Sequence, residues 1–307
     1  MKYIAAFMLF LSLAFAGCSS HSADGVHKEL FPKLSDTSKL LPLPTSTDQA
    51  YRKKLINEEV ILPDGKIRSK GIEAVPQDYD DFRFMNLDGV QWQDRSVQFG
   101  DFRGVSFRTA NANRADFSKG DFRLADLRWS SFNNAAMKGC NFAQAILFRT
   151  SMNESVLDSS DFRGSNMFGV KGHRSSFRYA DFSNALMKES ELTDADFSNS
   201  KAIKVKFIIT VFAGSRFDSA DYSYSDFTGA GLEECSFVHA RLHDVNFKGA
   251  HLQEASFRGA DLKGASFFAA ELVDTDFTGA INIPDDLIPF MDENGKATGV
   301  VFSVNDD

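Results

Sequence analysis

Large hydrophobic residues recur at almost every fifth position of the chain from Phe82 to Phe277. A small residue, often Ala, stands two positions before many of them, and Asp or Asn frequently separates the two, as in Ala115-Asp116-Phe117. A period of five fits neither the 3.6-residue period of a helix nor the two-residue period of a strand. The chain must therefore turn at regular intervals, which predicts a solenoid whose units bury apolar side chains against their neighbours.

This pattern resembles that of the pentapeptide-repeat family, whose consensus is Ala-(Asp/Asn)-(Leu/Phe)-x-x. The resemblance implies an all-β fold, a right-handed quadrilateral parallel β-helix with one pentapeptide on each side of a coil. It also implies that the large residue and the small residue two positions earlier point inward, while the other three face solvent. About ten coils over residues 82–280, each roughly 4.8 Å high, predict a rod roughly 50 Å long.

The interior of this solenoid is predicted to be largely aromatic. Phe residues recur at intervals of twenty from Phe82 to Phe182 and again from Phe177 to Phe277, so their rings would stack in columns. No proline interrupts the repeat, which agrees with a continuous ladder of backbone hydrogen bonds. Gly172 stands where a large residue is expected, and it predicts a local void or a bend.

The segments that flank the repeat predict small caps at both ends. In residues 47–81, we expect a helix that begins at Thr47 or Asp48, followed by two short strands around a turn at residues 62–67. In residues 281–307, we expect a helix that starts near Pro284 and a hairpin turn at Asn294-Gly295. Such caps would cover the open edges of the solenoid, which otherwise invite aggregation.

The N-terminus has the features of an export signal. Lys2 precedes an apolar run that is too short for a permanent membrane span, and residues 15–18, Phe-Ala-Gly-Cys, resemble a bacterial lipobox. The resemblance implies that residues 1–17 are a lipoprotein signal peptide, that Cys18 is acylated, and that residues 18–46 form a flexible tether. Ser19, instead of Asp, favours the outer membrane over the inner one. An ordinary secretory signal is the alternative.

Cysteine usage and charge limit the function further. Cys140 and Cys235 both fall on the small inward position nearly five coils apart, more than about 20 Å, so they are expected to be buried free thiols and not a disulfide. The net charge of −8 argues against non-specific binding to nucleic acid or to anionic membranes as the main function. We therefore expect no nucleic-acid partner, and a membrane partner only through the lipid on Cys18.

No constellation in the sequence points to catalysis, a metal or a cofactor. Nucleotide-binding glycine loops, Gly-x-Ser-x-Gly and His-Glu-x-x-His are all missing from the sequence. The Asp residues recur once per repeat and are explained by hydrogen bonds at the corners. The candidate metal ligands are His173, His239, His243 and His251, which we expect to be solvated surface residues. Hence we expect no catalytic residues, no metal and no cofactor.

Two outward features are candidates for binding. One is a column of Arg residues beside Asp residues, which predicts either surface ion pairs or a basic stripe for an anionic ligand: Arg83, Arg103, Arg123 and Arg163. The other is a group of apolar residues on or next to the second side of the coils, which we call the second-face patch: Trp129, Ile146, Phe148, Phe168, Leu186, Ile203, Ile208 and Ile209. A contiguous apolar patch is typical of a protein partner or self-association, unless the chain's own tether or N-terminal segment covers it.

These features favour a non-catalytic, lipid-anchored scaffold or protein-interaction module in the bacterial cell envelope. The alternative is a DNA mimic that binds topoisomerases, which the family resemblance and the acidic charge suggest and the export signal opposes. A third candidate is a β-helix that binds or cleaves polysaccharide, which the uniform coils without inserted loops disfavour.

Overall fold

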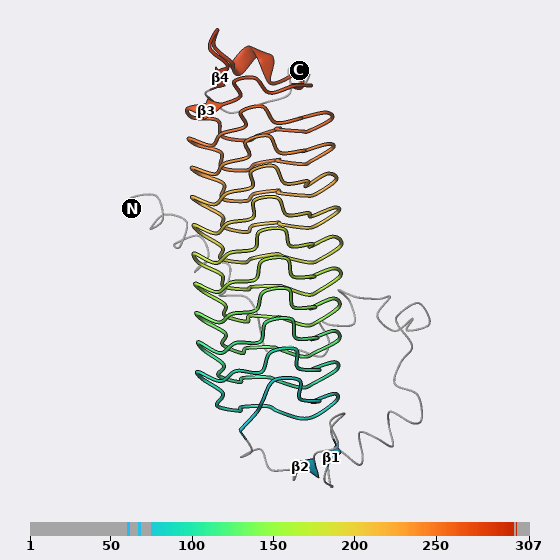
Figure 1. Ribbon diagram of the computed structural model, residues 1–307. Coiled ribbons are helices and arrows are strands. Elements are labelled where there is room, and N and C mark those ends of the chain that lie inside the picture. Colours follow the sequence, from blue (N-terminus) through green and yellow to red (C-terminus); the bar gives the residue numbers. More distant parts are fainter. Residues whose placement is uncertain (1–59, 62–66, 69–74, 298, 300–307) are drawn as a thin grey trace, which may run out of the picture. The chain divides into compact units, whose positions relative to one another are not determined.

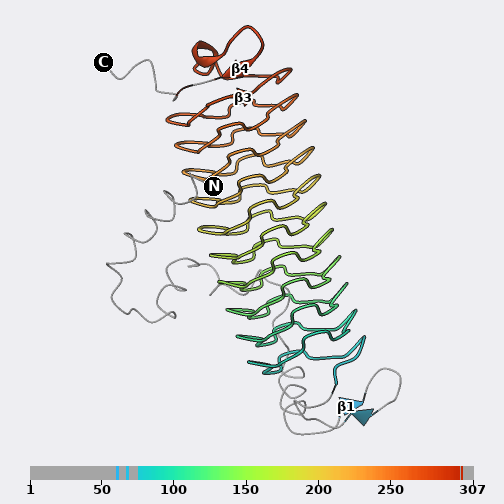
Figure 2. The ribbon, with the colours of Figure 1, turned by 90° about the vertical axis from the view of Figure 1, so that its left-hand side faces the viewer.

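The computed structural model describes residues 60–61, 67–68, 75–297 and 299. The chain divides into two units, Met1–Lys53 and Lys54–Asp307, and the first unit lies wholly outside the described residues. Cys18, residues 18–46 and the helix predicted from Thr47 or Asp48 therefore lie outside them as well. From residue 75 onward the backbone winds into a regular stack of coils (Figures 1 and 2).

Single-residue parallel bridges hold neighbouring coils together. They join residues that are twenty positions apart, from Asp81↔Asp101 through to Asp261↔Ile281, and the bridged residue always precedes the large apolar position. The backbone N–H of Phe82, for example, donates to the carbonyl of Asp101 at 2.8 Å. Within residues 75–274 the backbone forms only isolated bridges, and no strand of two or more residues, because a turn follows each bridge after one further residue. Each coil therefore has four short sides, as the five-residue period predicts.

Most corners are turns closed by a hydrogen bond between residues three apart, such as Met85 N–H to Phe82 O at 3.0 Å. The residue two positions after the large apolar one adopts a positive φ angle at nearly every corner. Glycine suits this conformation, and at Gly104 a Cβ atom would lie 2.5 Å from the ring of Phe84. Bulky residues also occupy such corners, including Ile209 with a φ of 56°. The sequence pattern did not reveal this strained position.

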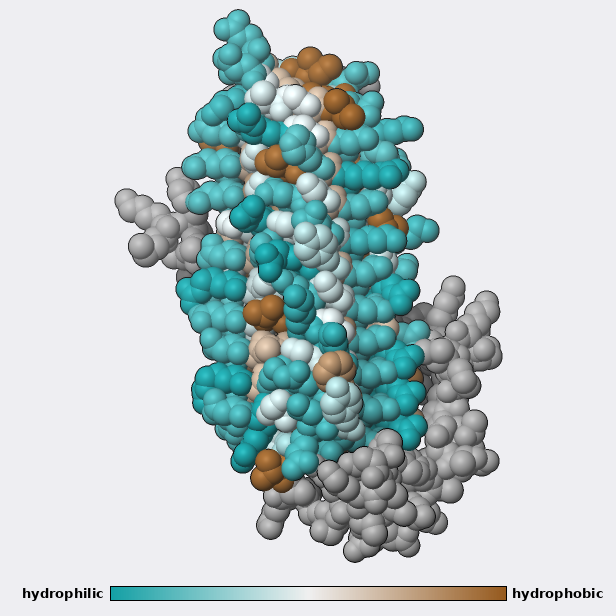
Figure 3. Space-filling view, viewed as in Figure 1, coloured by the Kyte–Doolittle hydropathy of each residue, from teal (hydrophilic) through white to brown (hydrophobic). Residues whose placement is uncertain are grey.

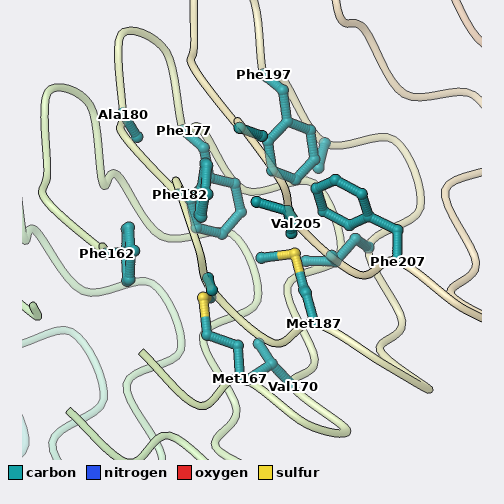
Figure 4. Close-up of a cluster of buried hydrophobic side chains, with 14 of the residues drawn as sticks. Phe162, Met167, Val170, Phe177, Ala180, Phe182, Met187, Phe197, Val205 and Phe207 are labelled. Carbon is teal, nitrogen blue, oxygen red and sulfur yellow. The ribbon is translucent and has the colours of Figure 1, made fainter. Parts of the chain in front are cut away.

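The predicted inward and outward phase is confirmed. The large residue of each repeat and the small residue two positions before it are buried almost throughout residues 82–277. Rings within the two predicted Phe columns stack with centroids 4.4–5.2 Å apart. Rings of neighbouring columns meet edge to face, as Phe162 and Phe177 do at 6.0 Å (Figure 4).

The void or bend predicted at Gly172 is wrong. A Cβ atom on Gly172 would lie 2.7 Å from Cδ2 of Leu192 and 3.4 Å from Cζ of Phe177. Leu192 is fully buried, so its side chain occupies the space that the missing side chain leaves. The bridge ladder continues through this coil, with Lys171 paired to Glu191.

The small inward residues also tie successive coils together by hydrogen bonds. At most positions where this residue is Ser, Thr or Cys, its side chain donates to the backbone carbonyl of the central residue 23 positions earlier, as Ser130 does to Phe107 O at 2.7 Å. Ser165, which has no partner among the described residues, and Ser200, which bonds the hydroxyl of Tyr222, are exceptions. The two predicted free thiols are confirmed as buried and unpaired with each other. Cys140 Sγ lies 3.0 Å from Phe117 O, and burial raises the pKa of this thiol well above its ordinary value.

Residues 281–297 pack over the last coil. The hairpin turn at Asn294-Gly295 is confirmed, because Gly295 N–H donates to Asp292 O at 3.1 Å and Met291 forms an antiparallel bridge with Ala297 across the turn. β4 (Lys296–Ala297) also pairs antiparallel with β3 (Thr275–Asp276) of the last coil. The helix predicted near Pro284 is wrong in form, because the segment makes a turn followed by the short 3₁₀ helix η3 (Ile288–Phe290). Pro289 within η3 has no N–H to continue a longer helix. Leu287 is fully buried against the core.

The pair of short strands predicted near residues 62–67 is confirmed. β1 (Val60–Ile61) pairs antiparallel with β2 (Ile67–Arg68). Among the described residues, no helix is both long and apolar enough to cross a membrane.

Candidate interaction surface

The Arg column on the first side is neutralised by carboxylates. Arg83 contacts Asp81 at 3.0 Å and also Asp101 of the next coil at 3.4 Å. The same arrangement recurs at Arg103, Arg123 and Arg163, each with the Asp two residues before it. Arg103 N–H groups donate to Asp101, and this hydrogen bond raises the pKa of Arg103. The structure thus favours the ion-pair interpretation over a basic stripe.

Three of the four candidate metal-binding histidines, all except His239, have polar partners within the solenoid. His243 Nε2 lies 2.6 Å from Asp261 Oδ2, and His251 Nδ1 lies 3.1 Å from Glu271 Oε2. His173 contacts Thr193 at 2.5 Å. Within the part of the chain that the structure describes, no group of three or more His, Cys, Asp or Glu side chains could hold a metal ion.

Three aromatic residues of the second-face patch form a continuous stack across three coils. The ring centroids of Phe148 and Phe168 are 5.4 Å apart with the rings nearly parallel, and Trp129 meets Phe148 edge to face at 5.7 Å. Two guanidinium groups lie over these rings: Arg128 is 5.5 Å from the ring of Trp129, and Arg149 is 5.5 Å from that of Phe148. The sequence pattern placed the aromatic residues together but missed these cations.

The remaining members of the second-face patch differ in exposure. Ile209 is 46% exposed and Trp129 is 44% exposed, whereas Ile146 and Ile208 are half-buried. Leu186 is only 9% exposed, so it contributes little outward surface, contrary to expectation. The bridge ladder places it between Asn166 and Lys206, which flank it in the neighbouring coils.

Ile203 belongs to the first side of the coil, as its position before the corner indicates. Its backbone N–H lies 3.3 Å from Ser183 Oγ in the preceding coil, in the column that also holds Arg163. The structure therefore joins Trp129, Phe148 and Phe168 into one contact network and leaves Ile203 on the neighbouring side.

Connected exposed aromatic side chains also occur elsewhere on the solenoid, since the rings of Tyr79 and Phe99 stack with their centroids 4.7 Å apart. On the face shown in Figure 3, hydrophilic residues predominate, and hydrophobic ones lie mostly as single spots between them. Isolated exposed apolar residues are normal in soluble proteins, whereas a connected group is typical of an interaction site. The arrangement suits binding; it brings together no nucleophile, base or metal ligand for chemistry.

The chain belongs to the pentapeptide-repeat family. The family model, described as Pentapeptide repeats, matches eight copies over residues 97–128, 125–164, 173–207, 210–249 and 246–281. Members of this family fold as right-handed quadrilateral β-helices, and the twenty-residue bridge ladder of this chain has that form. The family predicted from the repeat is thereby confirmed. No curated protein matches the chain.

Solved structures of two pentapeptide-repeat proteins are similar to this chain. One is HetL from the cyanobacterium Nostoc, involved in heterocyst differentiation regulation, with 20% identity, a TM-score of 0.38 and coverage of 68% of this chain and 92% of HetL. The other is QnrB1, a plasmid-mediated fluoroquinolone resistance protein, with 22% identity, a TM-score of 0.42 and coverage of 56% of this chain and 90% of QnrB1. At such identities neither structure indicates what this chain binds.

Proposed function

We propose that the protein is a non-catalytic, lipid-anchored scaffold of the bacterial cell envelope that binds a protein partner or a second copy of itself through the second-face patch. The observation that supports a binding role is the connected stack of Trp129, Phe148 and Phe168 on a solenoid of uniform coils. Residues 47–81 and 281–307 serve as caps of about ten coils in this proposal, because open coil edges would otherwise pair with other chains.

The anchor in this proposal is the lipid on Cys18. Each buried acyl methylene contributes about 0.8 kcal/mol, so several chains on one cysteine give stable membrane attachment. A flexible tether over residues 18–46 would reach roughly 30 Å from the bilayer. Ser19 favours the outer membrane as the location.

The second candidate function is a DNA mimic that binds a topoisomerase, which the resemblance to the pentapeptide-repeat family and the net charge of −8 support. The first side of the solenoid argues against it. A DNA mimic needs rows of unneutralised negative charge, whereas Asp101 and Asp121 lie within 2.7 Å of the Arg side chains that follow them. The scaffold is therefore the better-supported proposal.

The anchor is tested by comparing wild type with Cys18→Ser in membrane fractionation and intact-mass measurement. We expect wild type to sediment with membranes and to carry the mass of attached lipid. The variant should be soluble or remain as an uncleaved precursor. Equal mass and equal partitioning of the two proteins would refute the anchor.

The interaction surface is tested separately with Phe148→Asp combined with Phe168→Asp. Both side chains are half-buried on the outside, so we expect the fold to survive and the association to be lost. Affinity capture from solubilised envelope and sedimentation velocity give the readouts, and circular dichroism confirms the fold. Unchanged association at an unchanged melting temperature would mean that the second-face patch is not an interface.

A further inference from the structure

Around the second-face patch, the second side of the solenoid carries positive charge, although the net charge of the chain is −8. On the outward positions of the second side between residues 126 and 209, four cations stand against two carboxylates. The cations are Arg128, Arg149, Lys188 and Lys206, and the carboxylates are Asp126 and Glu189. This side therefore differs in sign from the molecule as a whole and would attract a negatively charged partner.

Most of these cations are not neutralised by the solenoid itself. Arg128 pairs with Asp126 at 2.7 Å, but within residues 75–297 no carboxylate lies in ion-pair distance of Arg149, Lys188 or Lys206. The contact that Arg149 makes is with the ring of Phe148, which leaves its N–H groups for an incoming acceptor. The first side shows the opposite rule, since each Arg of its column has an Asp partner.

The shape of the patch favours a protein over a lipid surface. Phe148 and Phe168 are half-buried and stacked along the coil axis, so they offer area but project little from the side of the solenoid. Binding to a bilayer requires apolar side chains that enter the headgroup region. A flat apolar area with a basic rim is instead typical of a protein interface.

We propose that the second-face patch binds a protein segment that carries acidic side chains beside apolar ones. Its apolar residues would pack on Phe148 and Phe168, and its carboxylates would pair with Arg149, Lys188 and Lys206. Arg149 and Lys188 lie two coils apart, about 10 Å along the axis, so the segment must present at least two separated acidic residues. The inference rests on the proposed function, because it specifies the partner of the same surface.

Synthetic peptides test this recognition on the purified full-length protein. The probe is a fluorescein-labelled twelve-residue peptide of alternating Glu and Leu. One control peptide has Lys in place of every Glu, and another has Ser in place of every Leu. Fluorescence anisotropy should show binding of the Glu/Leu peptide that weakens as salt rises, and at least tenfold weaker binding of both controls.

Matched variants locate the binding site. Arg149→Glu, and Phe148→Asp with Phe168→Asp, should each weaken binding of the Glu/Leu peptide at least tenfold. Arg163→Glu is the control, because Arg163 is an exposed arginine of the first side that already pairs with Asp161. It should leave the peptide affinity unchanged. Equal effects of Arg149→Glu and Arg163→Glu would overturn the proposed site.

Two further measurements identify the other possible occupants. Co-sedimentation with vesicles of phosphatidylethanolamine and phosphatidylglycerol that depends on Arg149 and Phe168 would make the surface lipid-binding and overturn the proposal. A dimer in sedimentation velocity that the double Phe variant abolishes, without peptide binding, would assign the surface to a second copy and overturn it as well. Equal membrane partitioning of wild type and Cys18→Ser would refute the lipid anchor, but it would not affect the conclusion drawn from peptide binding.

Discussion

Leu192 fills the space that Gly172 leaves in the core, with its Cδ2 atom only 2.7 Å from where a Cβ of residue 172 would stand. The two residues occupy the same inward column in neighbouring coils. The large side chain of Leu192 thus compensates for the missing side chain at Gly172 in the neighbouring coil. The packing of this region is a property of the pair and not of either residue alone.

The pair predicts a change of sign in a double-mutant cycle. Gly172→Ala should destabilise wild type by about 1–3 kcal/mol, because the new methyl group overlaps Leu192. In a Leu192→Ala background, which itself should cost about 2–5 kcal/mol, the same substitution should be neutral or stabilising because it fills the cavity. Urea denaturation of the four proteins gives the free energies of unfolding. Additive effects would show that the two side chains do not share the space.

The interior of the solenoid could be predicted well because burial follows the five-residue period. Each large residue from Phe82 to Phe277 points into the core, so position in the repeat alone predicts which side chains are buried. Exceptions such as Gly172 could not be predicted in the same way. Their outcome depends on where the side chain in the next coil lies, here that of Leu192.

The outer surface was predictable only in part, because contacts there depend on side-chain direction as well as on column. The columns placed Phe148 beside Phe168 correctly. They gave no sign that Arg149 would lie over Phe148, or that Leu186 would be almost buried despite its outward position. The repeat also hides the positive φ angle at Ile209, since residues of every kind occupy that corner position.

The hydroxyl groups at the small inward positions should stabilise the fold only where they have partners. Ser215 Oγ donates to Leu192 O at 2.7 Å and accepts from Ala195 N–H at 3.0 Å. Ser215→Ala should therefore cost about 1–2 kcal/mol, since two buried backbone groups lose their partner.

Ser165 provides the matched control for this effect. Its hydroxyl is fully buried and has no hydrogen-bond partner among the described residues. Ser165→Ala should be neutral or stabilising by up to about 1 kcal/mol, because it removes an unsatisfied buried polar group. Thermal denaturation of Ser215→Ala and Ser165→Ala measures both effects. A similar loss of stability in the two variants would show that the hydrogen bonds of the hydroxyl groups between coils do not account for the effect of Ser215→Ala.

Asp158 should make the stability of the protein depend on pH in the acid range. Burial alone would raise the pKa of this carboxyl, but hydrogen bonds from Arg178 and Ser176 outweigh burial and lower the pKa below its ordinary value of 3.8. A lowered pKa in the folded state stabilises the fold fully above about pH 4, and this contribution is lost as the pH falls through the lowered value.

The test compares wild type with Asp158→Asn, which keeps the shape of the side chain and removes its charge. Near pH 7 the variant should be less stable by about 1 kcal/mol, a small value because Arg178 is half-exposed. The difference should shrink as the pH is lowered below about 4. A difference that stays constant between pH 7 and pH 2.5 would rule out a charge contribution from Asp158.

We expect Ile209 to contribute to partner binding through the second-face patch and to lower the stability of the free protein. It is a β-branched residue with a φ of 56°, a conformation that costs an L-residue about 1–2 kcal/mol relative to glycine. Its side chain is 46% exposed, so burial in the free protein returns little of that cost. The residues one coil further on and two coils back in the same column are Gly229 and Gly169, which adopt this conformation without strain.

Ile209→Gly should therefore leave the free energy of unfolding unchanged or raise it by up to about 1 kcal/mol, the relief of strain being offset in part by the greater entropy of glycine in the unfolded chain. The same substitution should weaken binding of the Glu/Leu peptide, because an exposed apolar side chain leaves the second-face patch. Thr109→Gly is the control, since Thr109 has a φ of 53° in the same column but lies outside the patch. It should affect stability in the same direction and leave peptide binding intact. If Ile209→Gly instead destabilises the protein by more than about 2 kcal/mol, Ile209 is packed as part of the fold and the surface available to a partner is smaller than proposed.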